Sequence, residues 1–470
     1  MTTESDTTPG PSTPIVSALT PTLIRGTVVA ALGGLLFGFD TAVISGTTAA
    51  LRAEYGLGDF TLGFTVASAL IGTILGSLTA GVPADRFGRR PTLVGIAALY
   101  LVSAIGCAAA WDWISLVTFR FLGGLGVGGA SVVAPLYIAE IAPARWRGRL
   151  VAVTQFQIVA GILLAFLSNY VIALSVDQAI AWRWMFGVEA VPALAFLLLM
   201  GFTPESPRWL VGRGRDDQAL AVLMALGTPR RDAPAKLKII RDSFQPSRDD
   251  QITVFWSERH RAPILLAGAI AAFNQFSGIN AVMYYAPDIF RMAGAGDNAA
   301  LLQAVAIGGL NLVFTLAAMS VIDRLGRRKL MLIGSIGYIL SLTITAAAFF
   351  SFGSASEFTP TGSAVVLGGL LLFIASHAFG QGAVIWVFIG EIFPNTVRAY
   401  GQAWGSFVHW SMAALISWTF PMIAGVSGGY AFAFYAVMMV GQLIWVIRIM
   451  PETRGVPLEE MERLLHTSKS

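Results

Sequence analysis

The chain has 470 residues, of which 55% are hydrophobic and only 12% are charged. Soluble globular proteins carry about 25% charged residues, so this chain has too few charges to solvate soluble domains of its size. A single cysteine, Cys107, excludes an internal disulfide and a cysteine-based metal cluster, and four histidines leave little material for a histidine-rich metal site. We therefore expect a protein that lies mostly in a lipid bilayer and needs no metal and no cofactor.

Long uncharged runs predict membrane-spanning helices, because a helix needs about 20 apolar residues to cross the hydrocarbon core. The alternating pattern of barrel strands is absent, so the predicted fold class is an all-α membrane protein. Twelve spans are predicted. In chain order, ten of them lie at 22–51, 61–84, 91–111, 121–139, 150–176, about 184–203, 262–287, 298–322, 330–356 and 358–390. The last two lie in 399–447, on either side of a turn at Gly425–Gly429.

The charges divide the chain into five segments. Residues 205–260 hold 18 of the 58 charges, and apolar residues such as Ala219 and Leu223 recur there at helical spacing, which predicts a helical insert. The first 20 residues are rich in Ser, Thr and Pro and lack a signal-peptide pattern. The expected segments are a disordered tail (1–20), a first six-helix half (21–204), the insert (205–260), a second six-helix half (261–450) and a C-terminal tail (451–470).

The distribution of Lys and Arg predicts the orientation in the membrane. If both termini are cytoplasmic, the outer loops contain Arg52, Arg183 and Arg291, Arg120 lies within a span, and the other 27 of 31 basic residues face the cytoplasm. This asymmetry accounts for the pI near 9.3, so we do not expect nucleic acid as a partner. The predicted location is the plasma (inner) membrane, with many passes and both termini cytoplasmic.

Three charged signatures occur in each half, in the same order and after corresponding spans, which indicates an internal repeat. The first half contains Asp85-Arg86-Phe87-Gly88-Arg89-Arg90, Glu140-Ile141-Ala142-Pro143 with Arg147-Gly148-Arg149, and Pro204-Glu205-Ser206-Pro207-Arg208. The second half contains Asp323-Arg324-Leu325-Gly326-Arg327-Arg328, Glu391-Ile392-Phe393-Pro394 with Arg398, and Pro451-Glu452-Thr453-Arg454. Parallel six-span repeats place a substrate site between the halves, near the bilayer midplane.

We expect the acids and arginines of these signatures to form ion pairs between helices that close the cytoplasmic side in one conformation. Such a lock must contribute only a few kcal/mol, since the protein must reopen. The lock residues are Asp85, Arg86, Arg89, Glu140, Arg149, Glu205, Arg208, Asp323, Arg324, Arg327, Glu391, Arg398 and Glu452.

The sequence resembles the sugar porter family of the major facilitator superfamily from about residue 22 to 460, and within it the bacterial proton-coupled xylose and hexose symporters. The two Asp-Arg-x-Gly-Arg-Arg loops indicate the superfamily. The narrower resemblance is based on Gly38-Phe39-Asp40-Thr41-Ala42-Val43-Ile44-Ser45-Gly46, Pro204-Glu205-Ser206-Pro207-Arg208-Trp209-Leu210, and Gln275-Phe276-Ser277-Gly278-Ile279-Asn280 followed by Tyr284-Tyr285.

Three charges lie within predicted spans: Asp40, Arg120 and Glu189. An ionisable residue in the membrane costs at least about 2.5 kcal/mol and is a functional hypothesis by default. A carboxylate whose distance to an arginine changes between conformations also changes its proton affinity. The resemblance implies that Asp40 carries the proton and that Arg120 and Glu189 tune it. The alternative is a static buried salt bridge that fixes helix packing.

A sugar presents hydroxyls, which suit amides, and C–H faces, which suit indole rings. The spans offer such side chains in Gln155, Asn274, Gln275, Asn280, Trp386, His409 and Trp410. The resemblance implies sugar binding by Gln155, Gln275, Asn280, Trp386 and Trp410, with Tyr284 and Tyr285 as a gate. Buried amides can instead simply join neighbouring helices.

Three departures from the family leave the sugar open. Asn274 stands where Gln is usual, His409 stands where Asn or Gln is usual, and Ile162 replaces a Gln of the xylose symporter, which favours a hexose. The predicted function is proton-coupled monosaccharide symport, in a protein that needs to be no more than a monomer. A passive sugar uniporter of the same fold is the main alternative, and Asp40 argues against it because the passive facilitators have a neutral amide there. A sugar sensor would need a larger cytoplasmic domain, and no catalytic motif supports an enzyme.

Overall fold

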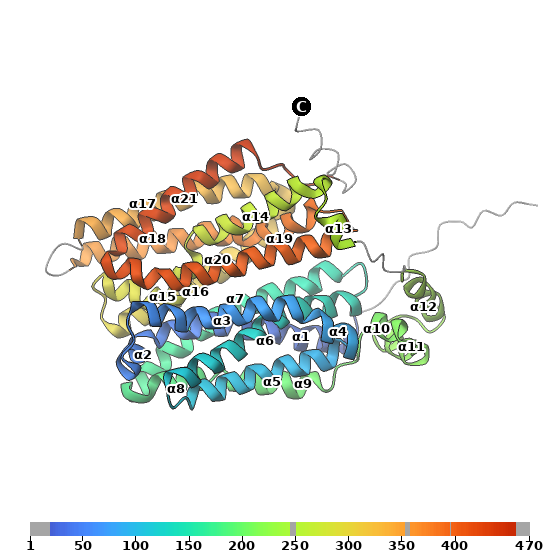
Figure 1. The fold of residues 1–470 in the computed structure, drawn as a ribbon. Coiled ribbons are helices and arrows are strands. Elements are labelled where there is room, and N and C mark those ends of the chain that lie inside the picture. Colours follow the sequence, from blue (N-terminus) through green and yellow to red (C-terminus); the bar gives the residue numbers. More distant parts are fainter. Residues whose placement is uncertain (1–18, 245–250, 353–357, 395, 457–470) are drawn as a thin grey trace, which may run out of the picture.

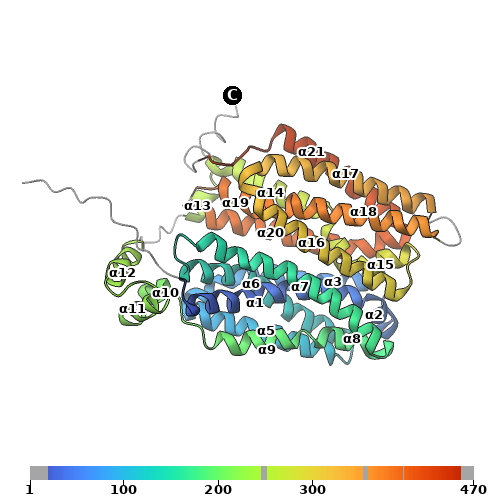
Figure 2. The ribbon, with the colours of Figure 1, turned by 180° about the vertical axis from the view of Figure 1, so that it is seen from behind.

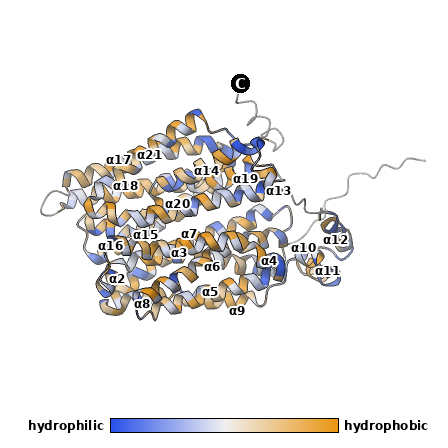
Figure 3. Ribbon diagram, viewed as in Figure 1, coloured by the Kyte–Doolittle hydropathy of each residue, from blue (hydrophilic) through white to orange (hydrophobic). Residues whose placement is uncertain are grey.

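The computed structural model describes residues 19–244, 251–352, 358–394 and 396–456, and every regular element within these ranges is a helix. Twelve of the described segments are long and apolar enough to cross a membrane, the number that the sequence predicts. Apolar colour covers the long helices along most of their length, whereas hydrophilic residues gather in the insert and at the helix ends (Figure 3). The predicted fold class, an all-α membrane protein, is confirmed.

The helices form two bundles that lie side by side (Figures 1 and 2). The first contains α1 (Pro21–Val43), η1 (Ile44–Gly46), α2 (Thr48–Tyr55), α3 (Asp59–Thr79), α4 (Gly81–Phe87), α5 (Arg89–Ala108), α6 (Trp113–Ile141), α7 (Arg147–Ser175), α8 (Gln178–Gly187) and α9 (Ala190–Met200). The second contains α14 (Arg261–Phe276), α15 (Ile279–Met292), α16 (Asp297–Leu325), α17 (Arg327–Phe352), α18 (Pro360–Phe379), α19 (Gln381–Ile392), α20 (Arg398–Val426) and α21 (Gly428–Arg448).

The segment between the bundles forms short helices, as the apolar spacing predicts. They are α10 (Pro207–Gly212), α11 (Asp216–Ala225), α12 (Ala233–Asp242), α13 (Gln251–Phe255) and η2 (Glu258–His260). Leu210, Leu223 and Leu237 bury their side chains together and join α10, α11 and α12. These three helices lie at one end of the molecule, here named the insert end, and α2 lies at the opposite end (Figure 1).

Close helix packing in the first half depends on glycines of the run at 123–129. A Cβ at Gly124 would lie 1.9 Å from the Ala69 carbonyl oxygen, and one at Gly128 would lie 2.2 Å from that of Thr73. Any side chain at these positions would push α6 away from α3.

Three spans are interrupted. Span 6 breaks between α8 and α9, span 7 at Gly278 with φ +85°, and span 10 at Gly380. The first span is also shorter than predicted, because the chain turns through η1 before α2 begins; there the Thr47 hydroxyl donates to the Ile44 carbonyl at 2.8 Å. Interrupted helices expose backbone and bring polar side chains into the membrane interior, where such irregularity is tolerated only beside protein or a cavity.

The buried apolar residues show where the two bundles meet. One cluster joins both bundles, with Phe39 and Leu62 from the first and Tyr285 and Phe420 from the second. Two further clusters lie toward the insert end, and each draws its transmembrane members from a single bundle. The bundles therefore share a core in the middle and at the opposite end, and have separate cores toward the insert end.

Candidate functional site

The three charged residues within the spans lie close together in the first half. Asp40 on α1, Arg120 on α6 and Glu189 between α8 and α9 are all buried, with 6%, 1% and 3% of their surface exposed. The Asp40 Oδ1 and Arg120 Nη1 atoms are 3.9 Å apart, and both residues act electrostatically on Glu189. The structure thus brings together the three charges that the sequence singles out.

Arg120 is held in place with much of its hydrogen-bonding capacity unused. Its Nε donates to the Thr65 carbonyl oxygen at 3.2 Å, and its guanidinium carbon lies 5.7 Å from the centre of the Phe186 ring. Within the described part of the chain, neither Nη1 nor Nη2 has a hydrogen-bond partner. The contact between Asp40 and Arg120 is therefore a charge interaction at 3.9 Å and not a hydrogen-bonded ion pair.

Polar and aromatic side chains meet where span 7 breaks; we name Asn274, Gln275, Asn280, Trp386, His409 and Trp410 the amide–indole cluster. Nε2 of Gln275 donates to Oδ1 of Asn274 at 2.9 Å and lies 3.3 Å from Nε2 of the His409 ring. The His409 ring packs between Trp386, at 5.1 Å between ring centres, and Trp410, at 4.7 Å. These residues lie on helices α14, α15, α19 and α20.

Two polar atoms of this cluster are buried without partners. Oε1 of Gln275 and Nδ2 of Asn280 have no hydrogen-bond partner among the described residues. A buried polar atom without a partner costs about 1–3 kcal/mol, so one acceptor and one donor are available for a bound hydroxyl compound. Trp386, which packs against the His409 ring beside Gln275, is 38% exposed and so offers an open indole surface.

No described contact joins the Asn280 side chain, on α15 beyond the break, to the other members of the cluster, and none joins Gln155. Gln155 is partly buried on α7, in the first half.

Phe37 makes a contact between the two halves: its ring packs edge-on against Trp410, with 5.4 Å between the ring centres. Phe37 is not among the residues predicted from the sequence, although it lies one helical turn before Asp40 and so shares its face of α1.

The two tyrosines predicted as a gate lie at a second irregularity in span 7. Tyr285 has non-helical angles (φ −126°, ψ 19°), and its hydroxyl donates to the Ser417 carbonyl oxygen at 2.9 Å. The Tyr284 hydroxyl contacts Thr41 of α1, next to Asp40. Both tyrosines are buried, and Tyr284 connects span 7 of the second half with span 1 of the first.

The repeated charged signatures form two matching networks at the insert end. In the first half Arg89 pairs with Glu140 at 2.9 Å, and Glu205 accepts the backbone N–H of Arg89 at 3.0 Å. In the second half Arg327 pairs with Glu391 at 2.7 Å, and Glu452 accepts the backbone N–H of Arg327 at 2.9 Å.

Glycine is required in both loops. Gly88 and Gly326 have positive φ, and a Cβ at Gly88 would lie 2.2 Å from Oε2 of Glu205. A Cβ at Gly326 would lie 2.6 Å from Oε2 of Glu452. Burial raises the pKa of the Glu205 carboxyl, and the backbone N–H groups of Ser206, Arg90 and Arg89 oppose that shift.

Arg89–Glu140 and Arg327–Glu391 are ion pairs between helices, as expected, but every ion pair that we describe among the lock residues stays within one half. Asp85 and Asp323 pair with the arginine four residues later in their own loop. The other lock arginines make contacts outside the ion pairs. Three lie over aromatic rings: Arg86 over Phe87, Arg149 over Trp146 and Arg208 over Phe244. Two take part in hydrogen bonds: Arg398 donates to the Phe393 carbonyl, and the Arg324 carbonyl accepts from Arg454.

The two networks differ in burial, which predicts different stability losses. Glu140 is 7% exposed and Glu391 29% exposed, and Thr453 also donates to Glu391 at 2.6 Å. Removing one partner of a buried pair costs about 3–5 kcal/mol. We expect Arg89→Met to lower the melting temperature of the purified protein in detergent more than Arg327→Met does.

Tryptophan fluorescence during heating would measure both losses. Arg86→Met is the control, because Arg86 is exposed and its change should leave the transition unmoved. A larger loss for Arg327→Met would show that burial of the acid does not set the strength of these pairs.

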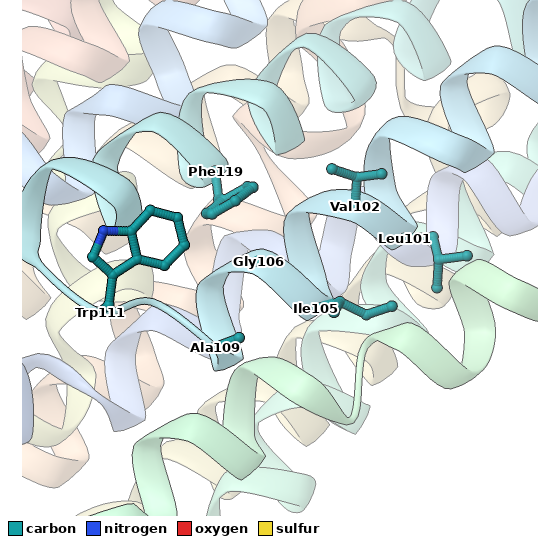
Figure 4. Close-up of a pocket in the computed structure, with 7 residues that line it drawn as sticks. All are labelled: Leu101, Val102, Ile105, Gly106, Ala109, Trp111 and Phe119. Carbon is teal, nitrogen blue, oxygen red and sulfur yellow. The ribbon is translucent and has the colours of Figure 1, made fainter.

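An apolar groove of about 370 Å³ opens on the outside of the first half (Figure 4). Trp111, which rims it, is 74% exposed. Its lining has no polar side chain to orient a hydroxyl compound except the Trp111 indole; the residues are Leu101, Val102, Ile105, Gly106, Ala109, Trp111 and Phe119. This groove is therefore not the candidate site.

Comparison with known proteins adds independent information. Residues 26–465 match the profile of the family described as "Sugar (and other) transporter". The chain is 37% identical over 479 residues to the D-xylose-proton symporter of Escherichia coli K12, covering 93% of this chain and 94% of that protein. It is 38% identical over 457 residues to the glucose transport protein of Synechocystis, covering 93% and 96%.

A solved structure gives the same result for the fold. The inward-open conformation of the xylose transporter XylE from E. coli superimposes with a TM-score of 0.81 at 36% identity. The match covers 93% of this chain and 98% of that one.

Proposed function

Because this chain belongs to the family of sugar (and other) transporters, we propose that it is a proton-coupled monosaccharide symporter that imports a hexose or a pentose by alternating access. Relatives named as D-xylose-proton and arabinose-proton symporters support the coupling and the substrate class. The partners are then one monosaccharide, protons and the lipid bilayer, and a monomer suffices. The proposed location is the inner membrane.

The sugar binds in the amide–indole cluster. The observation that carries this proposal is a pair of unpartnered buried atoms: Oε1 of Gln275, whose amide lies beside the His409 ring between Trp386 and Trp410, and Nδ2 of Asn280 on the following helix. A sugar hydroxyl donates to the first and accepts from the second, while its C–H face lies on an indole. Gln155 completes the site from the first half when the halves approach.

The proton binds at Asp40. Its carboxylate is buried with Arg120 at 3.9 Å and with Glu189 nearby. When Asp40 is charged, Arg120 is attracted to it, and when it is protonated the attraction is lost. A movement of α1 relative to α6 that changes this distance therefore changes the proton affinity of Asp40.

Contact between Tyr284 and Thr41 provides a path from the proton to the sugar. Thr41 follows Asp40 directly on α1, and Tyr284 lies on the segment that also carries Asn280. Closure of span 7 over a bound sugar thus acts on the helix that carries the proton. This is the arrangement that coupled transport needs, since each ligand must bias the same conformational equilibrium.

The distribution of contacts between the halves supports a conformation open toward the insert end. The shared core lies in the middle and at the opposite end, and the described lock pairs stay within each half. The excess of Lys and Arg makes the insert end cytoplasmic. We propose that this is the inward-open state, and that the lock residues pair across the halves in the outward-open state.

Sugar-induced proton uptake into proteoliposomes tests the function directly. A pH-sensitive dye inside the vesicles should report acidification when xylose, glucose or galactose is added outside, with one sugar giving the largest signal. Sugar entry without acidification, measured with the radiolabelled compound, would make the protein a passive uniporter. Protein-free vesicles are the control.

A further inference from the structure

A buried tyrosine and histidine of the second half form a hydrogen bond beside the amide–indole cluster but outside it. The hydroxyl oxygen of Tyr338 on α17 lies 2.6 Å from Nδ1 of His377 on α18. Tyr338 is fully buried, and the two ring centres are 6.0 Å apart. His377 lies three residues before Gly380, where span 10 breaks.

The same hydroxyl also meets the break of span 7. The Ser277 side chain lies near the Tyr338 hydroxyl, and Ser277 directly precedes Gly278. The Ser277 hydroxyl donates to the Asn274 carbonyl oxygen at 2.6 Å and accepts the backbone N–H of Ile279 at 3.3 Å. A continuous set of polar contacts therefore runs from His377, through Tyr338 and Ser277, to Asn274.

The uninterrupted helix α17 is held close to span 10 by small residues. A Cβ at Gly337 would lie 2.1 Å from the Ser376 hydroxyl oxygen, and one at Gly334 would lie 3.0 Å from Cα of Gly380. This close approach places Tyr338 within bonding distance of His377. A continuous helix thus serves as the common support for the breaks of two interrupted spans.

We infer that Tyr338 and His377 are positioning residues for the sugar: their hydrogen bond fixes the break of span 10 against that of span 7 and so holds the Asn274 and Gln275 amides in their binding orientation. The inference rests on the proposed function. Asn274 is joined to this contact chain through its carbonyl and to Gln275 through its side chain, at 2.9 Å. A small displacement of Ser277 therefore moves the amide pair, and binding depends strongly on such placement.

The test measures sugar exchange in proteoliposomes with D-xylose or D-glucose, whichever the unmodified protein exchanges faster. Tyr338→Phe and His377→Leu should each raise the half-saturating sugar concentration about threefold to tenfold, the effect of one lost hydrogen bond. The maximal rate per folded protein should change much less. The double variant should bind no more weakly than the weaker single variant, because both changes remove the same bond.

Two further variants separate positioning from packing. His377→Asn should restore the affinity, since an amide can donate to or accept from the Tyr338 hydroxyl. Tyr435→Phe is the matched control: Tyr435 is buried against Gly278 at the same break, and the structure gives its hydroxyl no described hydrogen bond. Removal of the Tyr435 hydroxyl should leave the affinity for the sugar unchanged.

Unchanged affinity in Tyr338→Phe would overturn the inference, and so would a His377→Asn variant that binds as weakly as His377→Leu. A fall in maximal rate alone, with normal affinity, would assign the pair to stability. If the unmodified protein exchanges none of the sugars offered, the proposed function fails instead, and that outcome is distinct from all of these.

Discussion

Replacing Asp40 with asparagine should abolish uphill sugar accumulation while sugar exchange across the membrane continues. Asparagine has nearly the same shape as aspartate but binds no proton in the relevant pH range, so the sugar cycle loses its driving ion. Asp40 is buried, 3.9 Å from Arg120. Uptake of radiolabelled sugar into proteoliposomes under an imposed pH gradient should therefore reach only the outside concentration.

Exchange should survive in this variant because the amide–indole cluster lies on α14, α15, α19 and α20, none of which carries the charged trio of Asp40, Arg120 and Glu189. Asp288→Asn is the matched control. Asp288 is also a carboxylate within a span, but it pairs with Arg291 at 2.7 Å on its own helix. That variant should still accumulate sugar.

Full accumulation by Asp40→Asn would remove Asp40 from the coupling mechanism. The buried ion pair would then be structural, and Glu189→Gln would be the next variant to assay, because Glu189 is the other buried carboxylate near Arg120. Loss of both exchange and accumulation would instead indicate that Asp40 holds α1 in place.

The second large effect is expected for Gln275→Ala, which should weaken sugar binding about tenfold to a hundredfold. Gln275 is fully buried, contacts Asn274 and His409, and keeps Oε1 free for the ligand. Its removal leaves a buried sugar hydroxyl without a partner, which costs about 1–3 kcal/mol, where 1.4 kcal/mol corresponds to a factor of ten in affinity. Titration calorimetry on the detergent-solubilised protein would measure the change.

Asn169→Ala provides the comparison for this prediction. Asn169 is an equally buried amide, but its Nδ2 donates to the Val43 carbonyl oxygen at 3.0 Å and so joins α7 to the end of α1. Its removal should reduce stability without changing sugar affinity. If Gln275→Ala binds sugar as tightly as the unmodified protein, the site lies elsewhere between the halves.

The candidate sugar site differs from the pattern of the resembling family at two positions, Asn274 and His409. His409 lies between the Trp386 and Trp410 rings and beside the Gln275 amide. Its aromatic ring packs against both indoles, which an amide side chain could not do in the same way. The Asn274 side-chain oxygen accepts a hydrogen bond from the Gln275 amide.

The sequence alone was enough to predict the number of spans, the fold class and the repeat. Ten of the twelve predicted spans lie in uncharged runs, and the two others contain very few charges. The pattern reflects the cost of placing charge in lipid, which acts on each segment separately. The charged loops were recognisable because Gly88 and Gly326 are each followed by the same pair of arginines. The family resemblance added candidate roles for Asp40 and Gln275.

The tertiary structure decided which of these residues meet. Composition shows that Asp40, Arg120 and Glu189 are costly in the membrane, but only the packing of α1, α6 and the α8–α9 break brings them together. Similarly, spacing along α17 gives no sign that Tyr338 reaches His377. That contact depends on the close approach of two helices at glycines and on where span 10 is broken.

The sequence also could not predict which lock residues pair with each other in this conformation. Arg89 and Arg327 have acidic partners available in both halves, and a charge pattern does not choose between them. In this conformation each arginine pairs with the glutamate of its own half, because the helices that carry those pairs share a core while the two halves are separate toward the insert end. Local hydrophobicity fixes the spans, whereas the relative position of the halves depends on contacts between residues far apart in the chain.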